Sequence, residues 1–352
     1  MFEDLGLDMA PQTAALWFGL ALGLAFGLLA EVSRFCLRRG LVGDRTERRP
    51  ALGVWLMALA VSVIGTQAAV TAGLIDFGGH RFHTTDLPVV AIALGGLLFG
   101  AGMVLARGCA SRVTVLAASG NLRALVVLLV LALVAQATMR GVLAPLRIAL
   151  AEPGVSLGSY GALPLSLGVV LALAAVVIAR RSGAGWRLLL AGAAIGALVP
   201  VAWVGTGLVL HDPFDPIPLE ALSFTAPAAD ALLWAQLGPA VTPGLGAGLL
   251  LGVLAGAAAS ALASGRFRPL GFAGAAETGR YVAGGALMGF GGVLAGGCTV
   301  GAGISGVSTL GISALLALAA IAAGAVAAER LLSRNAGAAV GQAPRPAARQ
   351  AA

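Results

Sequence analysis

The stretch GGLLFGAGMVLARGCAS, from Gly95 to Ser111, appears a second time as GGALMGFGGVLAGGCTV, from Gly284 to Val300. Between the first glycine and the cysteine of each copy, ten of fifteen aligned positions are identical. A shared apolar composition does not by itself repeat a glycine spacing that ends in the same reactive residue. The repeat therefore predicts a functional element that is used twice, centred on Cys109 and Cys298.

The composition around this repeat is typical of a membrane protein. Hydrophobic residues make up 59% of the chain and charged residues 11%, whereas roughly a quarter of the residues of soluble domains are charged. Successive apolar runs of about 20 residues are long enough to cross a hydrocarbon core of about 30 Å. The alternating pattern of barrel strands is absent. The sequence predicts an all-α polytopic membrane protein.

Nine apolar runs are candidate membrane spans. They cover residues 12–35, 51–75, 88–106, 124–146, 162–179, 188–210, 244–263, 281–296 and 311–329. We expect one transmembrane domain over residues 1–335, with repeat halves at about 12–146 and 188–330 joined by a connector span at 162–179. The Ala-, Gly- and Pro-rich tail at 336–352 is expected to be disordered and cytoplasmic.

Charged residues indicate the orientation of these spans. The connections at 37–50, 180–187 and 264–280 carry arginines, whereas the segment 211–243 carries four acidic residues and no basic one. Because cytoplasmic connections are enriched in basic residues, the N-terminus is expected outside and the C-terminus inside. The net charge of +7 comes from such short arginine runs, so no nucleic-acid partner is expected.

This orientation makes the third and eighth spans cross the bilayer in opposite directions. The two cysteine motifs then form an inverted-topology repeat, in which substrate sites lie near the midplane at broken helices. Glycine-containing breaks at residues 107–111 and 296–303 supply such interruptions. We therefore expect short broken or re-entrant helices after each motif.

The residues around the breaks suit an anion. Glycines spaced about four apart favour close helix packing, while Gly108 and Gly297 let a helix stop and expose backbone N–H groups. Cations beside a thiol favour both thiolate and anion. The predicted path residues are Cys36, Cys109, Cys298, Gly108, Gly297, Thr299, Ser111, Arg107 and Arg112. The three cysteines have no zinc-site spacing, so no metal and no cofactor is expected.

Three further expectations concern residues near these motifs. Glu31 and Arg34 are spaced to pair within a helix. Gln67 and Gln136 are expected to join helices. Tryptophans commonly mark membrane interfaces, and this role is expected for Trp17, Trp55, Trp186, Trp203 and Trp234.

Three motifs in order resemble the cysteine motifs of the YeeE/YedE family. They are SRFC at 33–36, GCAS at 108–111 followed by GNLR at 120–123, and GGCTVGAGISG at 296–306. The resemblance implies an hourglass-like helical bundle in the bacterial inner membrane, with Cys36, Cys109 and Cys298 along a narrow central path. It also implies a small cytoplasmic sulfur-carrier protein with a cysteine as partner. Ala302, where relatives often have His, and Arg112 depart from the family pattern.

The resemblance implies uptake of thiosulfate or a related sulfur-containing anion, with selenium species as an alternative cargo. Two other functions fit the residues alone. An intramembrane sulfurtransferase or oxidoreductase would form a persulfide on Cys109 or Cys36, and a passive channel would admit a small neutral solute. The arginines beside Cys109 favour the anion, and no nucleotide-binding motif indicates coupling to ATP.

Overall fold

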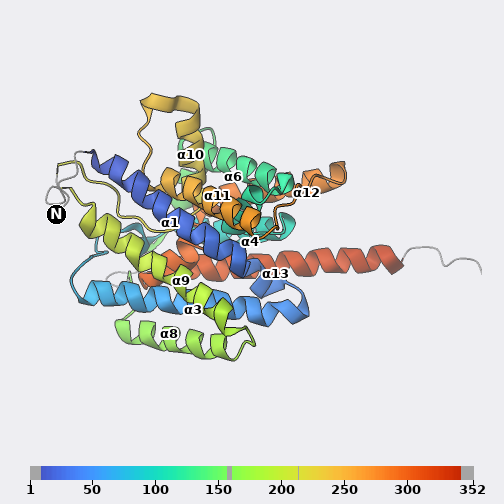
Figure 1. Ribbon diagram of the computed structural model, residues 1–352, viewed down its shortest axis with the longest axis horizontal. Coiled ribbons are helices and arrows are strands. Elements are labelled where there is room, and N and C mark those ends of the chain that lie inside the picture. The colour runs from blue at the N-terminus through green and yellow to red at the C-terminus, as the bar shows by residue number, and fades with distance from the viewer. Residues whose placement is uncertain (1–8, 157–160, 213, 342–352) are drawn as a thin grey trace, which may run out of the picture.

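The computed structural model of the protein describes residues 9–156, 161–212 and 214–341. It is a bundle of helices with one antiparallel pair of two-residue strands, β1 (Asp86–Leu87) and β2 (Val155–Ser156) (Figure 1). The long helices are α1 Pro11–Ser33, α3 Arg45–Thr71, α4 Val89–Leu105, α6 Leu122–Arg140, α8 Leu165–Arg180, α9 Trp186–Val204, α11 Leu245–Ala263, α12 Ala275–Leu294 and α13 Ile312–Gly341. The shorter ones are the α-helices α2 Leu37–Val42, α5 Ala110–Ala118, α7 Ala144–Ala151 and α10 Thr225–Leu237, the 3-10 helices η2 Arg81–His83 and η4 Gly238–Ala240, and the π-helical segments η3 Gly205–Val209 and η5 Gly301–Gly306.

Each predicted span corresponds to one long helix, so the all-α polytopic prediction is confirmed. Seven segments are long and apolar enough to cross a membrane by themselves. The connector helix α8 is shorter, with 16 residues, and α12 is not among the seven because its first turns carry Glu277 and Arg280. The predicted tail begins within α13, which continues to Gly341, and its residues 342–352 lie outside the described part.

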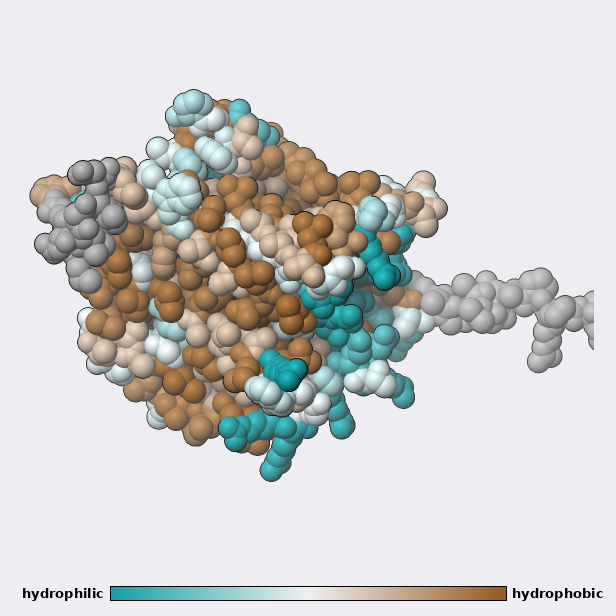
Figure 2. Space-filling view, viewed as in Figure 1, coloured by the Kyte–Doolittle hydropathy of each residue, from teal (hydrophilic) through white to brown (hydrophobic). Residues whose placement is uncertain are grey.

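The three arginine-bearing connections lie at one end of the bundle. Arg266 of the α11–α12 connection donates to Glu31 at the end of α1 with an N–O distance of 2.6 Å, and Gly53 of α3 packs against Ser182 of the α8–α9 connection. At the opposite end Arg140 pairs with Asp230 of the acidic segment at 2.7 Å. Figure 2 shows hydrophilic surface gathered where α13 leaves the bundle, and mostly hydrophobic surface across the sides.

Glycine faces bring the helix backbones close together. On α1, Gly19, Gly23 and Gly27 pack against the backbone of α11, where Gly252 meets Gly23. A Cβ at Gly23 would lie 3.0 Å from the Cα of Gly252. Small residues spaced by four allow such approach in lipid, where van der Waals contact drives helix association. The packing role predicted for the glycines is confirmed.

The repeated motif helices α4 and α12 pack against each other in antiparallel fashion. Gly95 faces Gly291 and Gly102 faces Gly284. The second glycine of each copy faces another partner, because Gly96 packs against α13 and Gly285 against α6. In both copies, one glycine thus contacts the other motif helix and the next glycine contacts a neighbouring helix outside the motif.

Two of the five tryptophans are not interfacial. Trp17 and Trp186 are exposed, as expected for interface residues, but Trp203 and Trp55 are buried in the core. The indole N–H of Trp203 donates to Ser308 Oγ at 3.3 Å, and Trp55 packs against Gly303. The prediction was wrong for these two because their helices, α9 and α3, turn these positions towards the central η5 segment.

Candidate functional site

All three cysteines stand at the same kind of helix break. A left-handed residue lies two positions before each: Arg34 with φ 51°, Arg107 with φ 57° and Gly296 with φ 73°. This conformation closes a helix by returning backbone N–H groups to the last carbonyls. For a non-glycine residue it costs roughly 1–2 kcal/mol, so the two arginines are held there by the surrounding structure.

Sequence reasoning paired Cys109 with Cys298 and missed that Cys36 stands at an equivalent break. In the first break Phe35 N–H donates to Ala30 O at 3.1 Å, and in the second Gly108 N–H donates to Met103 O at 3.0 Å. Cys36 and Cys109 then precede the first residues of α2 and α5. The sequence did contain one sign of this equivalence, because an arginine stands two positions before both Cys36 and Cys109.

The structure brings Cys36 and Cys109 together. Their Sγ atoms lie 3.6 Å apart in a hydrogen bond, although the residues are 73 positions apart in the chain. Cys109 Sγ also bonds to Ser111 Oγ at 3.4 Å. All three side chains are almost fully buried. Ser111 is therefore placed beside the thiol of Cys109.

Cys298 is separate from this pair. Its Sγ accepts the N–H of Gly301 at 3.3 Å, and within the described residues no other cysteine sulfur bonds to it. Gly297 precedes it with φ 157°, and a Cβ there would lie 2.7 Å from the nitrogen of Ala302. At the equivalent Gly108 a Cβ would meet side-chain atoms only, with Val113 at 3.3 Å and Arg112 at 3.7 Å. The third break, before Cys298, therefore requires a glycine at position 297 more strictly than the second break, before Cys109, requires one at position 108.

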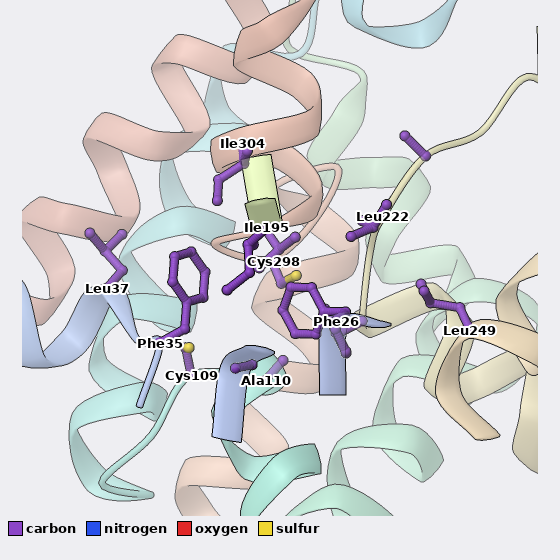
Figure 3. Close-up of a cluster of buried hydrophobic side chains, with 14 of the residues drawn as sticks. Phe26, Phe35, Leu37, Cys109, Ala110, Ile195, Leu222, Leu249, Cys298 and Ile304 are labelled. Carbon is purple, nitrogen blue, oxygen red and sulfur yellow. The ribbon is translucent and has the colours of Figure 1, made fainter. Parts of the chain in front are cut away.

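Aromatic rings fill the space around the cysteines. The ring of Phe26 lies 6.2 Å from that of Phe35 and 5.0 Å from that of Phe224, measured between centroids. The three rings and the three cysteines belong to one buried cluster, and Figure 3 shows Phe26, Phe35, Cys109 and Cys298 in it. The three cysteines are 3% exposed or less, so each thiol is enclosed by the side chains around it.

The predicted polar residues have different surroundings. The Thr299 hydroxyl is buried and has no hydrogen-bond partner among the described residues. Arg112 is half-buried, with a buried Nη1 that likewise lacks one there, and its charge acts on Cys36 and Cys109. Arg107 is exposed. Of the two arginines beside Cys109, only Arg112 lies among buried groups.

The predicted pairing of Glu31 with Arg34 was wrong. Glu31 accepts instead from Arg266 Nη2 at 2.6 Å and from Ser260 Oγ at 3.0 Å. Arg34 has the left-handed backbone of the break, which takes it out of the helix that the spacing rule assumed. The glutamines do join helices: Gln67 donates to Ser308 O at 2.8 Å and Gln136 to Gln236 Oε1 at 3.1 Å.

Sequence reasoning missed three arginines that surround the entrance to the third break. A cavity of about 210 Å³ is lined by Arg81, Arg140 and Arg147 and reaches Gly296 and Gly297. A neighbouring cavity of about 560 Å³ shares two of these arginines and reaches Gly301, the residue whose N–H bonds to Cys298. Both lie at the end of the bundle that carries the acidic segment. Arg140 and Arg147 lie on the successive helices α6 and α7, whereas Arg81 is about 60 positions away in η2, so only the fold brings Arg81 to the other two.

The larger cavity also holds titratable groups with shifted pKa values. Burial lowers the pKa of His80 to about 4, and the neighbouring Arg81 charge acts in the same direction. Desolvation by the cavity walls raises the pKa of Glu220 and lowers that of Arg81, although both side chains are partly exposed, and each partly offsets the shift of the other through its charge. His80 packs edge-on against Trp203 with ring centroids 5.2 Å apart, so an aromatic contact holds the imidazole in the wall of the cavity.

Metal-ligating side chains are not grouped together in the described residues. These residues contain no group of three or more His, Cys, Asp or Glu side chains arranged to hold a metal ion. His83, in the same connection as His80, bonds through Nε2 to Thr309 O at 2.8 Å. The polar groups at the cysteine breaks are thiols, hydroxyls, backbone N–H groups and guanidinium groups, which suit an anion.

Comparison with known proteins identifies similar sequences. A family model described as sulphur transport matches two successive stretches, residues 32–184 and 179–327. The chain is 27% identical to the thiosulfate transporter TsuA of Escherichia coli K12, over 81% of this chain and 86% of that protein. It is also 31% identical over 99 residues to the thiosulfate transporter TsuA of Spirochaeta thermophila, a match that covers 28% of this chain and 29% of the relative.

Proposed function

Because this chain belongs to the sulphur transport family and is a multi-pass membrane transporter, we propose that its cargo is thiosulfate or a closely related sulfur-containing anion. Both relatives named above are thiosulfate transporters. The observation that carries the proposal is the cavity in which Arg81, Arg140 and Arg147 meet the glycines before Cys298. Guanidinium groups bind oxyanions through charge-assisted hydrogen bonds.

The anion enters from the end of the bundle that carries the acidic segment. The arginine-lined cavity offsets the negative charge of Asp230 and Glu220 nearby. The sulfonate oxygens face the guanidinium groups and the backbone N–H groups of the third break, and the terminal sulfur points inward. The Thr299 hydroxyl, which has no partner among the described residues, supplies a further donor.

The terminal sulfur then passes from Cys298 to the Cys109–Cys36 pair. The cavities support Cys298 as the first thiol on the path. Gly296 and Gly297, just before Cys298 in the chain, line one cavity, and Gly301, just after it, lines the other. Cys36 lies directly before α2, which forms the first part of the arginine-bearing connection at the other end. Thiols donate weakly and sulfur accepts weakly, and weak successive sites suit permeation because an ion bound too firmly would not leave. Arg112 adds positive charge beside the pair.

The whole transmembrane region acts as one domain of two inverted halves. The antiparallel packing of α4 and α12 and the two successive family matches support this arrangement. We place the chain in the bacterial inner membrane with its N-terminus outside. The end of the bundle with the three arginine-bearing connections, where the C-terminal helix α13 leaves, is in the cytoplasm. A small sulfur-carrier protein with a cysteine would receive the cargo at that end.

Replacement of the cysteines tests the path. We expect Cys109→Ala combined with Cys298→Ala to abolish thiosulfate uptake into cells without another thiosulfate importer. Thr71→Ala is the matched control, since Thr71 is exposed and bonds within its own helix. Undiminished uptake by the double variant would refute a cysteine-lined path.

A liposome uptake panel tests the cargo. Thiosulfate, sulfate, sulfite and selenium analogues are compared at equal concentration, with a small neutral solute as a further sample. Preference for thiosulfate supports the proposal, and preference for a selenium analogue would identify that anion instead. Equal passage of the neutral solute would indicate a passive channel.

A further inference from the structure

Cys36 and Cys109 form the one close pair of thiols among the described residues. Their Sγ atoms are 3.6 Å apart, and all three cysteines are free. Each of the two lies directly before a short helix, Cys36 before α2 and Cys109 before α5. Cys298 bonds to the N–H of Gly301 instead, so it serves as an internal reference thiol.

A small movement would join the two sulfurs. A disulfide has an S–S length of about 2.05 Å, so the 3.6 Å separation has to shorten by about 1.5 Å. The side-chain bond from Cys109 to Ser111 is the hydrogen bond that would be given up. The neighbouring residues Phe35 and Ala110 are apolar and buried, so they offer no competing nucleophile.

We propose that Cys36 and Cys109 are a redox modification site at which a hydroperoxide forms a disulfide between them. One thiolate attacks the peroxide, the O–O bond breaks, and a sulfenic acid and hydroxide form. The second thiolate attacks the sulfenic sulfur, the S–S bond forms and hydroxide leaves. In sum two thiols and hydrogen peroxide give one disulfide and two water molecules, with two electrons passing from sulfur to oxygen.

The disulfide would stop transport. It removes the thiol hydrogens of Cys36 and Cys109, which are the donors proposed for the cargo sulfur. It also links the α1–α2 break covalently to the α4–α5 break. Thiol reductants reverse it by exchange. This consequence rests on the function proposed above, whereas formation of the cross-link does not.

Peptide mapping of the full-length protein in liposomes tests the proposal. The protein is treated with hydrogen peroxide, free thiols are alkylated, and the peptides are analysed by mass spectrometry. We expect one cross-linked peptide joining Cys36 to Cys109, alkylated Cys298, and loss of thiosulfate uptake that dithiothreitol restores. Cys298→Ser should still give the cross-link, and Cys109→Ser should not.

Two results would overturn the proposal. One is the absence of the cross-linked peptide under conditions that oxidise other thiols in the same sample. The other is a complete cross-link with unchanged uptake, which would remove the effect on transport. If untreated protein takes up no thiosulfate, the proposed function fails, and the cross-linked peptide still decides whether the redox site exists.

Discussion

Arg266 donates to the buried carboxylate of Glu31 with an N–O distance of 2.6 Å. This contact ties the connection between α11 and α12 to the end of α1, only a few residues before Cys36. The side chain of Glu31 is 9% exposed and that of Arg266 is 42% exposed. The guanidinium can be hydrated when the contact is lost, but the carboxylate cannot.

We expect Arg266→Ala to lower the free energy of unfolding by about 1–3 kcal/mol, because it leaves a buried charge with Ser260 as its remaining side-chain donor. Thermal unfolding in detergent measures the change. Arg39→Ala is the control, since the Arg39–Glu47 pair is partly exposed at 23% and 48% and such pairs contribute about 0–1 kcal/mol. Equal effects of the two variants would contradict the prediction.

The equivalent glycines before Cys109 and Cys298 should respond differently to alanine. Gly297→Ala places a Cβ 2.7 Å from the Ala302 nitrogen at a φ of 157°, and such backbone strain costs of order 1–3 kcal/mol. We expect lower thermal stability and reduced uptake. Gly108→Ala should be tolerated, because its Cβ would meet side-chain atoms and no backbone, with Val113 at 3.3 Å and Arg112 at 3.7 Å. A larger loss for Gly108→Ala than for Gly297→Ala would be inconsistent with the described breaks.

Removal of an entrance arginine should weaken uptake at low thiosulfate concentration. Arg81→Gln or Arg147→Gln deletes one charge from the cavity that reaches Gly296. A lost charge-assisted contact of about 1.5 kcal/mol or more raises the half-saturation concentration about tenfold or more. Uptake kinetics measure it, with Arg180→Gln as a control that removes one exposed charge at the other end. An unchanged half-saturation concentration in both entrance variants would exclude the entrance role.

Acid should destabilise the fold through His80. Its pKa is lowered to about 4 in the folded protein, whereas an unfolded histidine has a pKa of about 6.5. Between these values the unfolded chain binds more protons, so stability falls as pH falls, by up to about 3 kcal/mol over the whole window. Glu220 has a raised pKa in the folded protein. Its contribution to stability therefore decreases as pH rises, which is the opposite of the His80 contribution.

The His80→Phe variant isolates the histidine contribution. It keeps an aromatic ring against Phe77 and Trp203 and removes the titrating group. Thermal unfolding measured from pH 7 down to pH 4 should show a smaller loss of stability than in the parent chain. Identical pH dependence of the two proteins would assign the effect to other groups.

Much of the fold was predictable because the bilayer restricts what a sequence can do. Apolar length and glycine spacing identified the helices and the duplicated motif, and the positions of the arginines predicted which connections share an end. Three motifs in order predicted the family. The breaks at Cys109 and Cys298 could be found because Gly108, Gly296 and Gly297 stand in an otherwise apolar run.

The sequence by itself determined the nine helical segments, the two breaks and the identity of the thiols, because hydropathy and backbone freedom are local properties. The tertiary structure decided which groups meet. Cys36 lies beside Cys109, whereas Cys298 bonds to Gly301. Glu31 pairs with Arg266 instead of Arg34. Around the break before Cys298, one cavity is lined by Arg81, Arg140 and Arg147. These contacts join residues from different helices, and their distances depend on how close the glycine faces allow those helices to come.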